Sequence, residues 1–160
     1  MKIQIKKSKN ADTRTCDWSK VTKDDLRKNS LQHIYDVMKG MLFFSKLIRD
    51  AGFKHDYTKI DQIDQFHKDF SHGFDKDHQT WWKNHQEEER HHLKDPDYVQ
   101  NNVNLIDILE MITDGVMAGL ARSGEYRPEE ISDDLLRKAF DNTIQLLLDN
   151  VELEQSAGDK

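Results

Sequence analysis

The chain has 160 residues, a length typical of one domain, and its 36% hydrophobic residues fall in periodic stretches that predict a small helical protein rather than disorder. A net charge of -6 argues against broad nucleic-acid binding, and the single cysteine, Cys16, excludes an intramolecular disulfide and a zinc site of several thiolates. No segment resembles a signal peptide or approaches the roughly 20 apolar residues of a membrane span, so we expect a cytoplasmic protein without membrane contacts.

The first part of the chain predicts a short strand or ordered tail and then a long helix. Ile3 and Ile5 alternate with lysines, which is typical of an edge strand, within a peripheral tail over residues 1–20. Thr22 is the expected N-cap of the helix, and Gly52 is expected to end it. A strong apolar face follows from Leu31, Ile34, Met38, Met41, Leu42 and the segment from Phe44 to Ile48.

Two shorter helices are predicted next. Helical spacing relates Ile60, Ile63, Phe66 and Phe70. The stretch from Ser71 to Asp75 should break this helix because it contains Gly73. The third helix carries Trp81, Trp82 and His85.

The last part of the chain predicts two further helices. Asn104 should cap a helix from about Leu105 to Arg122, which Ser123 and Gly124 close. Pro128 and Ser132 introduce the final helix, and residues 155–160 form a peripheral tail. The apolar positions of the final helix are Leu135, Leu136, Phe140, Ile144, Leu147, Leu148 and Val151. The expected fold is an all-α bundle of about five to six helices, forming a single domain over residues 1–160.

The helix from Leu105 carries three acidic residues on one stripe, Asp107, Glu110 and Asp114. An acidic stripe is ordinarily a solvated face. Here apolar residues cover nearly all of the remaining circumference, which predicts a central helix. Carboxylates on a central helix are costly unless they are paired or bind a metal, which favours Asp114 as a metal ligand.

All eight histidines lie between His33 and His92. Imidazole and carboxylate ligands suit Mn, Co, Ni, Fe or Zn, so this confinement indicates a site for one or two divalent transition metal ions. His33 lies in the long helix in packed surroundings, where a satisfied core histidine is the alternative. His55 and Asp56 could converge on one ion near a helix start, although a surface N-cap is the better explanation for Asp56 when the dipeptide is taken alone.

His85, His91 and His92 form a third group of candidate ligands. They surround the charged segment from Glu87 to Arg90, and a solvated helix end with exposed histidines is the alternative interpretation.

The order of His33, His55-Asp56 and Asp114 resembles the H…HD…D signature of the HD-domain metal-dependent phosphohydrolases. The segment from His55 to Lys59 resembles the HD-x-x-K variant of two-metal members such as the HD-GYP phosphodiesterases, whose Gly-Tyr-Pro motif is absent. His91-His92 resembles the paired histidines of those members. The segments RHH and NLIDILEMITDG are also similar to small phage and bacterial proteins with an HD-like histidine pattern.

The resemblance covers roughly Leu31 to Gly124 and implies a metal-dependent hydrolase of phosphate esters, in the host cytoplasm if the protein is phage-encoded. The implied ligands of the main metal are His33, His55, Asp56 and Asp114, and those of a second metal or a phosphate are His85, His91 and His92. Asp56 and Lys59 are the implied catalytic residues, because Lys59 replaces a glutamate that positions water in many single-metal members and would instead stabilise phosphate charge. Arg122 is a candidate phosphate contact, although capping of its helix explains it as well.

Nucleotides dominate the substrates of this family, so a (deoxy)nucleoside 5'-monophosphate is the expected substrate. The alternatives are a nucleotide phosphodiesterase, a di-iron oxidative enzyme and a non-catalytic, metal-stabilised module that binds a protein. Whether the chain forms a homo-oligomer is left open by the sequence.

Overall fold

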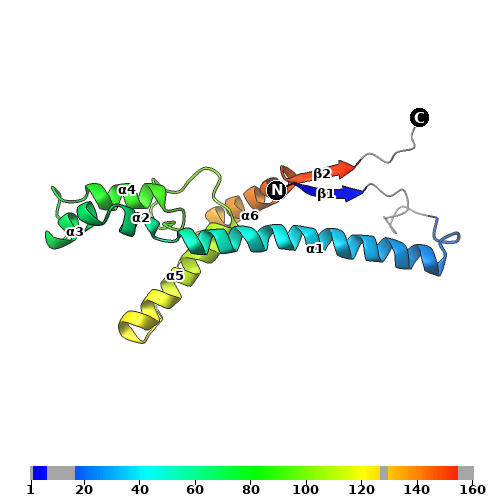
Figure 1. The fold of residues 1–160 in the computed structure, drawn as a ribbon, viewed down its shortest axis with the longest axis horizontal. Coiled ribbons are helices and arrows are strands. Elements are labelled where there is room, and N and C mark those ends of the chain that lie inside the picture. The colour runs from blue at the N-terminus through cyan, green and yellow to red at the C-terminus, as the bar shows by residue number, and fades with distance from the viewer. Residues whose placement is uncertain (1, 7–16, 127–129, 155–160) are drawn as a thin grey trace. The chain divides into compact units, whose positions relative to one another are not determined.

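The structure, a computed structural model, describes residues 2–6, 17–126 and 130–154 (Figure 1). These residues confirm the predicted all-α class, with six helices and two short strands among them. In chain order the elements are β1 (Ile3–Lys6), α1 (Lys23–Lys54), α2 (Tyr57–Asp61), α3 (Ile63–Ser71), α4 (Thr80–Glu88), α5 (Leu105–Ser123), α6 (Asp133–Leu148) and β2 (Val151–Glu154).

The chain divides into two compact units. The first unit contains residues 1–46 and 145–160, and the second unit contains residues 47–144. The expectation of one domain over the whole chain stays a prediction. No helix among the described residues combines the length and the apolar character needed to cross a bilayer.

The first unit joins the two ends of the chain in a parallel pair of strands, β1 and β2. Ile3 pairs with Val151, and its side chain is buried. The predicted N-terminal strand is therefore confirmed. The predicted extension of the last helix to Val151 is wrong, because α6 ends at Leu148 and the backbone beyond it bonds to β1.

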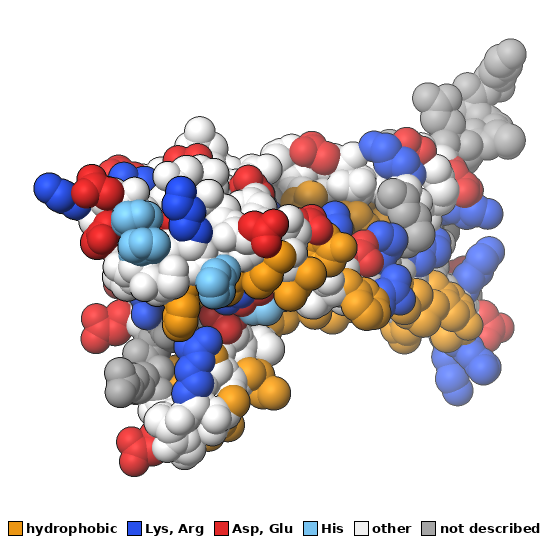
Figure 2. All heavy atoms as spheres, turned by 60° about the vertical axis from the view of Figure 1, so that its left-hand side comes forward, with side chains coloured by type: hydrophobic (Ala, Val, Ile, Leu, Met, Phe, Trp, Pro, Cys, Tyr) orange, Lys and Arg blue, Asp and Glu red, His pale blue; other side chains and the backbone are white. Residues whose placement is uncertain are grey.

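Helix α1 begins where the sequence predicts. Thr22 Oγ1 accepts a bond from Asp25 N at 3.2 Å, and the Asp25 carboxylate accepts one from Thr22 N at 3.1 Å. The helix does not end at Gly52 but runs to Lys54, because the left-handed residue that stops it is Asp56. Its predicted apolar face is exposed, as at Met41, and hydrophobic side chains reach the surface in Figure 2.

In the second unit, α2, α3 and α4 lie together (Figure 1). Trp81 is completely buried and stacks on Phe66, with ring centroids 4.0 Å apart. The Asp69 carboxylate accepts a bond from Trp81 N at 2.8 Å and so satisfies the start of α4. One helix was predicted where α2 and α3 are separate, and the predicted break after Ser71 is confirmed.

Helix α5 has the predicted ends. Asn104 accepts a bond from Ile106 N at 2.9 Å, and Gly124 takes a φ of 71° that closes the helix. The core of the second unit consists of Leu93, Val103, Ile108, Met111 and Ala139. The prediction that α5 is central is wrong for its C-terminal half, because Met117 and Leu120 are 64% and 51% exposed there.

Candidate metal centre

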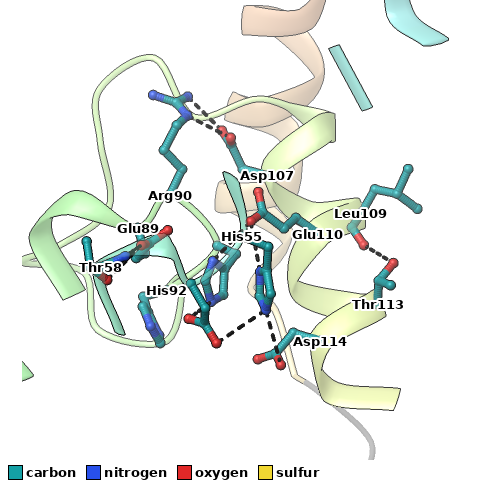
Figure 3. Close-up of polar contacts among 12 residues, drawn as sticks. His55, Thr58, Glu89, Arg90, His92, Asp107, Leu109, Glu110, Thr113 and Asp114 are labelled. Carbon is teal, nitrogen blue, oxygen red and sulfur yellow. Dashed lines mark hydrogen bonds and ion pairs between the residues drawn. The ribbon is translucent and has the colours of Figure 1, made fainter. Parts of the chain in front are cut away.

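Histidine and carboxylate side chains from four segments of the second unit converge at one place, part of which is drawn in Figure 3. Three groups of three residues each bring one ligand atom per residue within 4.8 Å of the others. These groups are His55 with His91 and Asp114, Asp56 with His91 and His92, and Glu89 with His91 and Glu110. His91 is common to all three, and its side chain is buried.

Asp56 lies at the junction of α1 and α2 and contacts most of the cluster. Its Oδ1 is 3.4 Å from His85 Nε2 and 3.7 Å from His91 Nε2, and its Oδ2 is 3.4 Å from His55 Nε2. The backbone of Asp56 has a φ of 56°, which is uncommon for a residue other than glycine. Such strain concentrates at functional sites, because the surrounding structure must hold it in place.

The orientation of His55 is set by Glu110 on α5. Glu110 Oε1 lies 3.0 Å from His55 Nδ1, and a carboxylate can only accept, so Nδ1 carries the proton. In the neutral ring the other nitrogen, Nε2, has a free electron pair. That atom lies 3.6 Å from Asp114 Oδ1, so it faces two carboxylates, those of Asp56 and Asp114.

A longer chain of hydrogen bonds orients His85. Thr58 Oγ1 donates its single proton to Glu89 Oε1 at 2.7 Å, so it must accept from His85 Nδ1, which lies 2.6 Å away. His85 Nε2 is therefore unprotonated, and it lies 2.9 Å from His92 Nε2. A histidine that binds a metal commonly has its second nitrogen held in this way by a hydroxyl or a carboxylate.

Burial keeps two of these histidines neutral. It lowers the pKa of His85 to about 3, with a further contribution from the neighbouring His92. Burial together with the charge of His91 lowers the pKa of His92 to about 4. Both rings therefore offer electron pairs at neutral pH.

Charge compensation dominates at the other members of the cluster. Burial lowers the pKa of His91, but the Glu110 carboxylate outweighs it and leaves that pKa raised. Burial raises the pKa of Asp56, but Lys59, whose ammonium contacts Asp56 Oδ2, leaves it lowered. The pKa of Glu110 is likewise lowered, because the bonds from His91 and His55 outweigh its burial.

The donor set fits a divalent transition metal ion. Asp56 Oδ1 and His91 Nε2 are buried and, among the described residues, have no hydrogen-bond partner, whereas His91 Nδ1 lies 3.3 Å from Glu110 Oε1. Buried polar atoms of this kind are rare and call for an explanation such as a bound ion. Ligands about 2.0–2.2 Å from an ion lie roughly 3.0–3.6 Å apart. The separations of 2.9–3.7 Å among Asp56, His85, His91 and His92 are close to this range.

A partly buried ion pair between Arg90 and Asp107 holds the His91–His92 segment against α5. Arg90 donates from Nε and Nη2 to the two carboxylate oxygens of Asp107, both at 2.7 Å (Figure 3). Arg90 also donates to Asn102, while Asp107 accepts from Asn104 N at 2.8 Å. One carboxylate therefore caps α5 and positions the histidines that follow Arg90.

The structure brings together six residues that the sequence predicts as ligands: His55, Asp56, His85, His91, His92 and Asp114. His33 is not among them, since it lies in the first unit with an exposed side chain instead of the packed surroundings expected. Lys59 contacts the carboxylate of Asp56, and Arg122 is exposed in the last turn of α5.

Sequence reasoning did not select three residues that orient the cluster, namely Glu110, Thr58 and Glu89. Glu110 could have been found, because it lies four residues before Asp114 on the acidic stripe. Thr58 and Glu89 belong to segments 31 residues apart, and no local pattern pairs them.

A scan against protein-family models and searches of curated proteins and of solved structures found no match for this chain.

Proposed function

We propose that the second unit binds one or two divalent transition metal ions and hydrolyses phosphate esters, as the resemblance to HD-domain phosphohydrolases implies. The observation that carries the proposal is one cluster of histidine nitrogens and carboxylate oxygens. It includes the unprotonated Nε2 of His85 and the buried Oδ1 of Asp56, which has no hydrogen-bond partner among the described residues. Asp56 faces His55 through one oxygen and His85 through the other, a position suited to joining two sets of ligands.

When bound, such an ion lowers the pKa of a water molecule and polarises a phosphoryl oxygen. His55, Asp56 and Asp114 would hold one ion, and His85, His91 and His92 would complete a second set with the other oxygen of Asp56. Glu110 and the pair of Thr58 and Glu89 fix a proton on Nδ1 of His55 and His85, so that Nε2 is the ligand atom of the neutral rings.

Lys59 would offset negative charge on the substrate. Its ammonium contacts Asp56 Oδ2, so a positive charge is fixed at the edge of the ligand cluster. A phosphoryl group bound by the cluster would lie within the field of that charge, which is stronger in a partly buried site than in water.

A nucleoside monophosphate is the first substrate to consider. A cavity of about 290 Å³ is lined by three residues of the cluster, His91, His92 and Asp114, and also by Trp82 and Gln86. Trp82 offers a flat ring for stacking a base, and the Gln86 amide can both donate and accept at its polar edge. These two side chains support the nucleotide class named by the resemblance.

The test is phosphate release by metal-stripped protein refilled with Mn, Co, Ni, Fe or Zn. The substrates are nucleoside mono-, di- and triphosphates and bis-p-nitrophenyl phosphate. Asp56→Ala is compared with Asp97→Ala, which removes an exposed carboxylate of the same unit outside the cluster. We expect metal-dependent release that Asp56→Ala loses and Asp97→Ala retains.

Stoichiometric metal binding without release of phosphate from any substrate would contradict the proposal. Iron-dependent oxygen uptake would then favour a di-iron oxidative enzyme. A large loss of melting temperature in Asp114→Ala, again without turnover, would favour a metal-stabilised binding module.

A further inference from the structure

A second cavity opens onto the metal centre from another side. Its volume is about 350 Å³, within the range of roughly 300–1,000 Å³ found for small-molecule sites. Three cluster residues line one part of it, namely His55, Glu110 and Asp114. A group bound in this cavity would therefore be adjacent to a phosphate held at the metal centre.

The other walls of this cavity are apolar. The end of α1 contributes Ile48, Ala51 and Gly52, and α5 contributes Ile106, Leu109 and Met117. Among the described residues that line it there is no lysine, arginine, phenylalanine, tyrosine or tryptophan. The cavity thus contrasts with the one beside Trp82, where an indole and an amide are available.

Thr113 is the one uncharged polar side chain of the lining, and its hydroxyl is already used. It donates to Leu109 O at 2.7 Å, within its own helix (Figure 3). A polar group placed against the apolar walls, away from His55, Glu110 and Asp114, would therefore lose its water and find no donor there, which is unfavourable. An apolar group would lose water at no such cost.

We propose that this cavity is a subsite for an apolar group, a linear alkyl chain or an unsubstituted aromatic ring, of a ligand whose phosphate is held at the metal centre. The phosphate part of this inference rests on the proposed function. A nucleobase, whose edge carries donors and acceptors, belongs in the cavity beside Trp82 and not here.

Gly52 provides a way to fill the cavity without breaking the helix. A Cβ atom added at this position meets nothing within 4 Å, and Gly52 lies in the last turn of α1. Replacing a helical glycine by alanine or leucine also favours the helix. Gly52→Leu therefore occupies the subsite, and Gly52→Ala is its matched control.

The experiment measures calorimetric binding of methyl-, butyl- and hexylphosphonate to the manganese-loaded full-length chain. We expect the dissociation constant of the unchanged protein to fall about threefold to fourfold for each methylene that is buried. In Gly52→Leu the dependence on chain length should disappear, while metal content and methylphosphonate affinity stay unchanged. Gly52→Ala should keep most of the dependence.

Equal affinity for the three phosphonates would overturn the subsite. So would a dependence of affinity on chain length that persists in Gly52→Leu, or one that is undiminished in metal-stripped protein. The two proposals fail in different ways. Dependence on chain length without hydrolysis of any ester would keep the subsite and reject the phosphohydrolase. Hydrolysis without that dependence would do the reverse.

Discussion

Arg90→Ala tests whether the pair of Arg90 and Asp107 supports the metal centre. The guanidinium binds both oxygens of the carboxylate at 2.7 Å, and Arg90 directly precedes His91. Removing it leaves Asp107 with its bond from Asn104 N but without a counter-charge. We therefore expect lower stability of the second unit and weaker metal binding by His91.

The magnitude follows from the burial of the two side chains. Breaking a fully buried ion pair costs about 3–5 kcal/mol, because the remaining charge stays buried. The Asp107 side chain is 4% exposed, whereas that of Arg90 is 32% exposed, so water can enter the space that Arg90 vacates. A loss of about 2–3 kcal/mol is therefore expected, which lowers the melting temperature by roughly 4–12 °C in a chain of this size.

Thermal and urea unfolding of the metal-free full-length protein measure this loss, and chelator competition measures metal affinity. The matched control is Arg137→Ala, because Arg137 also pairs with an aspartate, Asp141, at 3.0 Å. The Arg137 side chain is 73% exposed and its guanidinium lies 5.4 Å from the Phe140 ring, so the control should cost less than about 1 kcal/mol. Equal losses for the two variants would refute the argument from burial.

Three further outcomes are expected. Thr58→Val removes the hydroxyl that orients His85 and should weaken metal binding about 10–100-fold by chelator competition, with ligand residues unchanged. His33→Ala should leave metal content unchanged by elemental analysis, because His33 lies in the first unit with an exposed side chain. Gly119→Ala should cost about 1–3 kcal/mol in urea unfolding, because its Cβ would lie 2.8 Å from Glu125 O.

Features set by neighbouring residues could be predicted from the sequence. The caps at Thr22 and Asn104 and the stop at Gly124 depend on side chains within a few positions, and all three are found. Seven of the eight histidines lie in the second unit, and four of these belong to the cluster. Helix α4 and the segment that follows it bring His85, His91 and His92 together over a short stretch of chain.

Features set by distant residues could not be predicted in this way. The pairing of Ile3 with Val151 joins opposite ends of the chain, and no local pattern contains it. Periodicity showed an apolar face around His33 but not what covers that face, and so the packed surroundings expected for His33 are absent. Gly52 was expected to end the helix because of its residue type, yet Asp56 is the residue with the left-handed backbone. The Asp56 carboxylate contacts Lys59 and faces three histidines, and these distant contacts hold its backbone in place.

The cluster can be interpreted as a catalytic or as a structural metal site. Both interpretations explain the buried atoms that lack partners, because an ion would satisfy them in either case. They differ in what surrounds those atoms. A structural site is closed by its protein ligands, whereas a catalytic site keeps a position open for water or substrate. Asp114 lines both the cavity beside Trp82 and the apolar cavity, and so one candidate ligand is reached from two sides. This openness favours a catalytic site, because a structural site gains its stability from a closed set of protein ligands and needs no adjoining cavity.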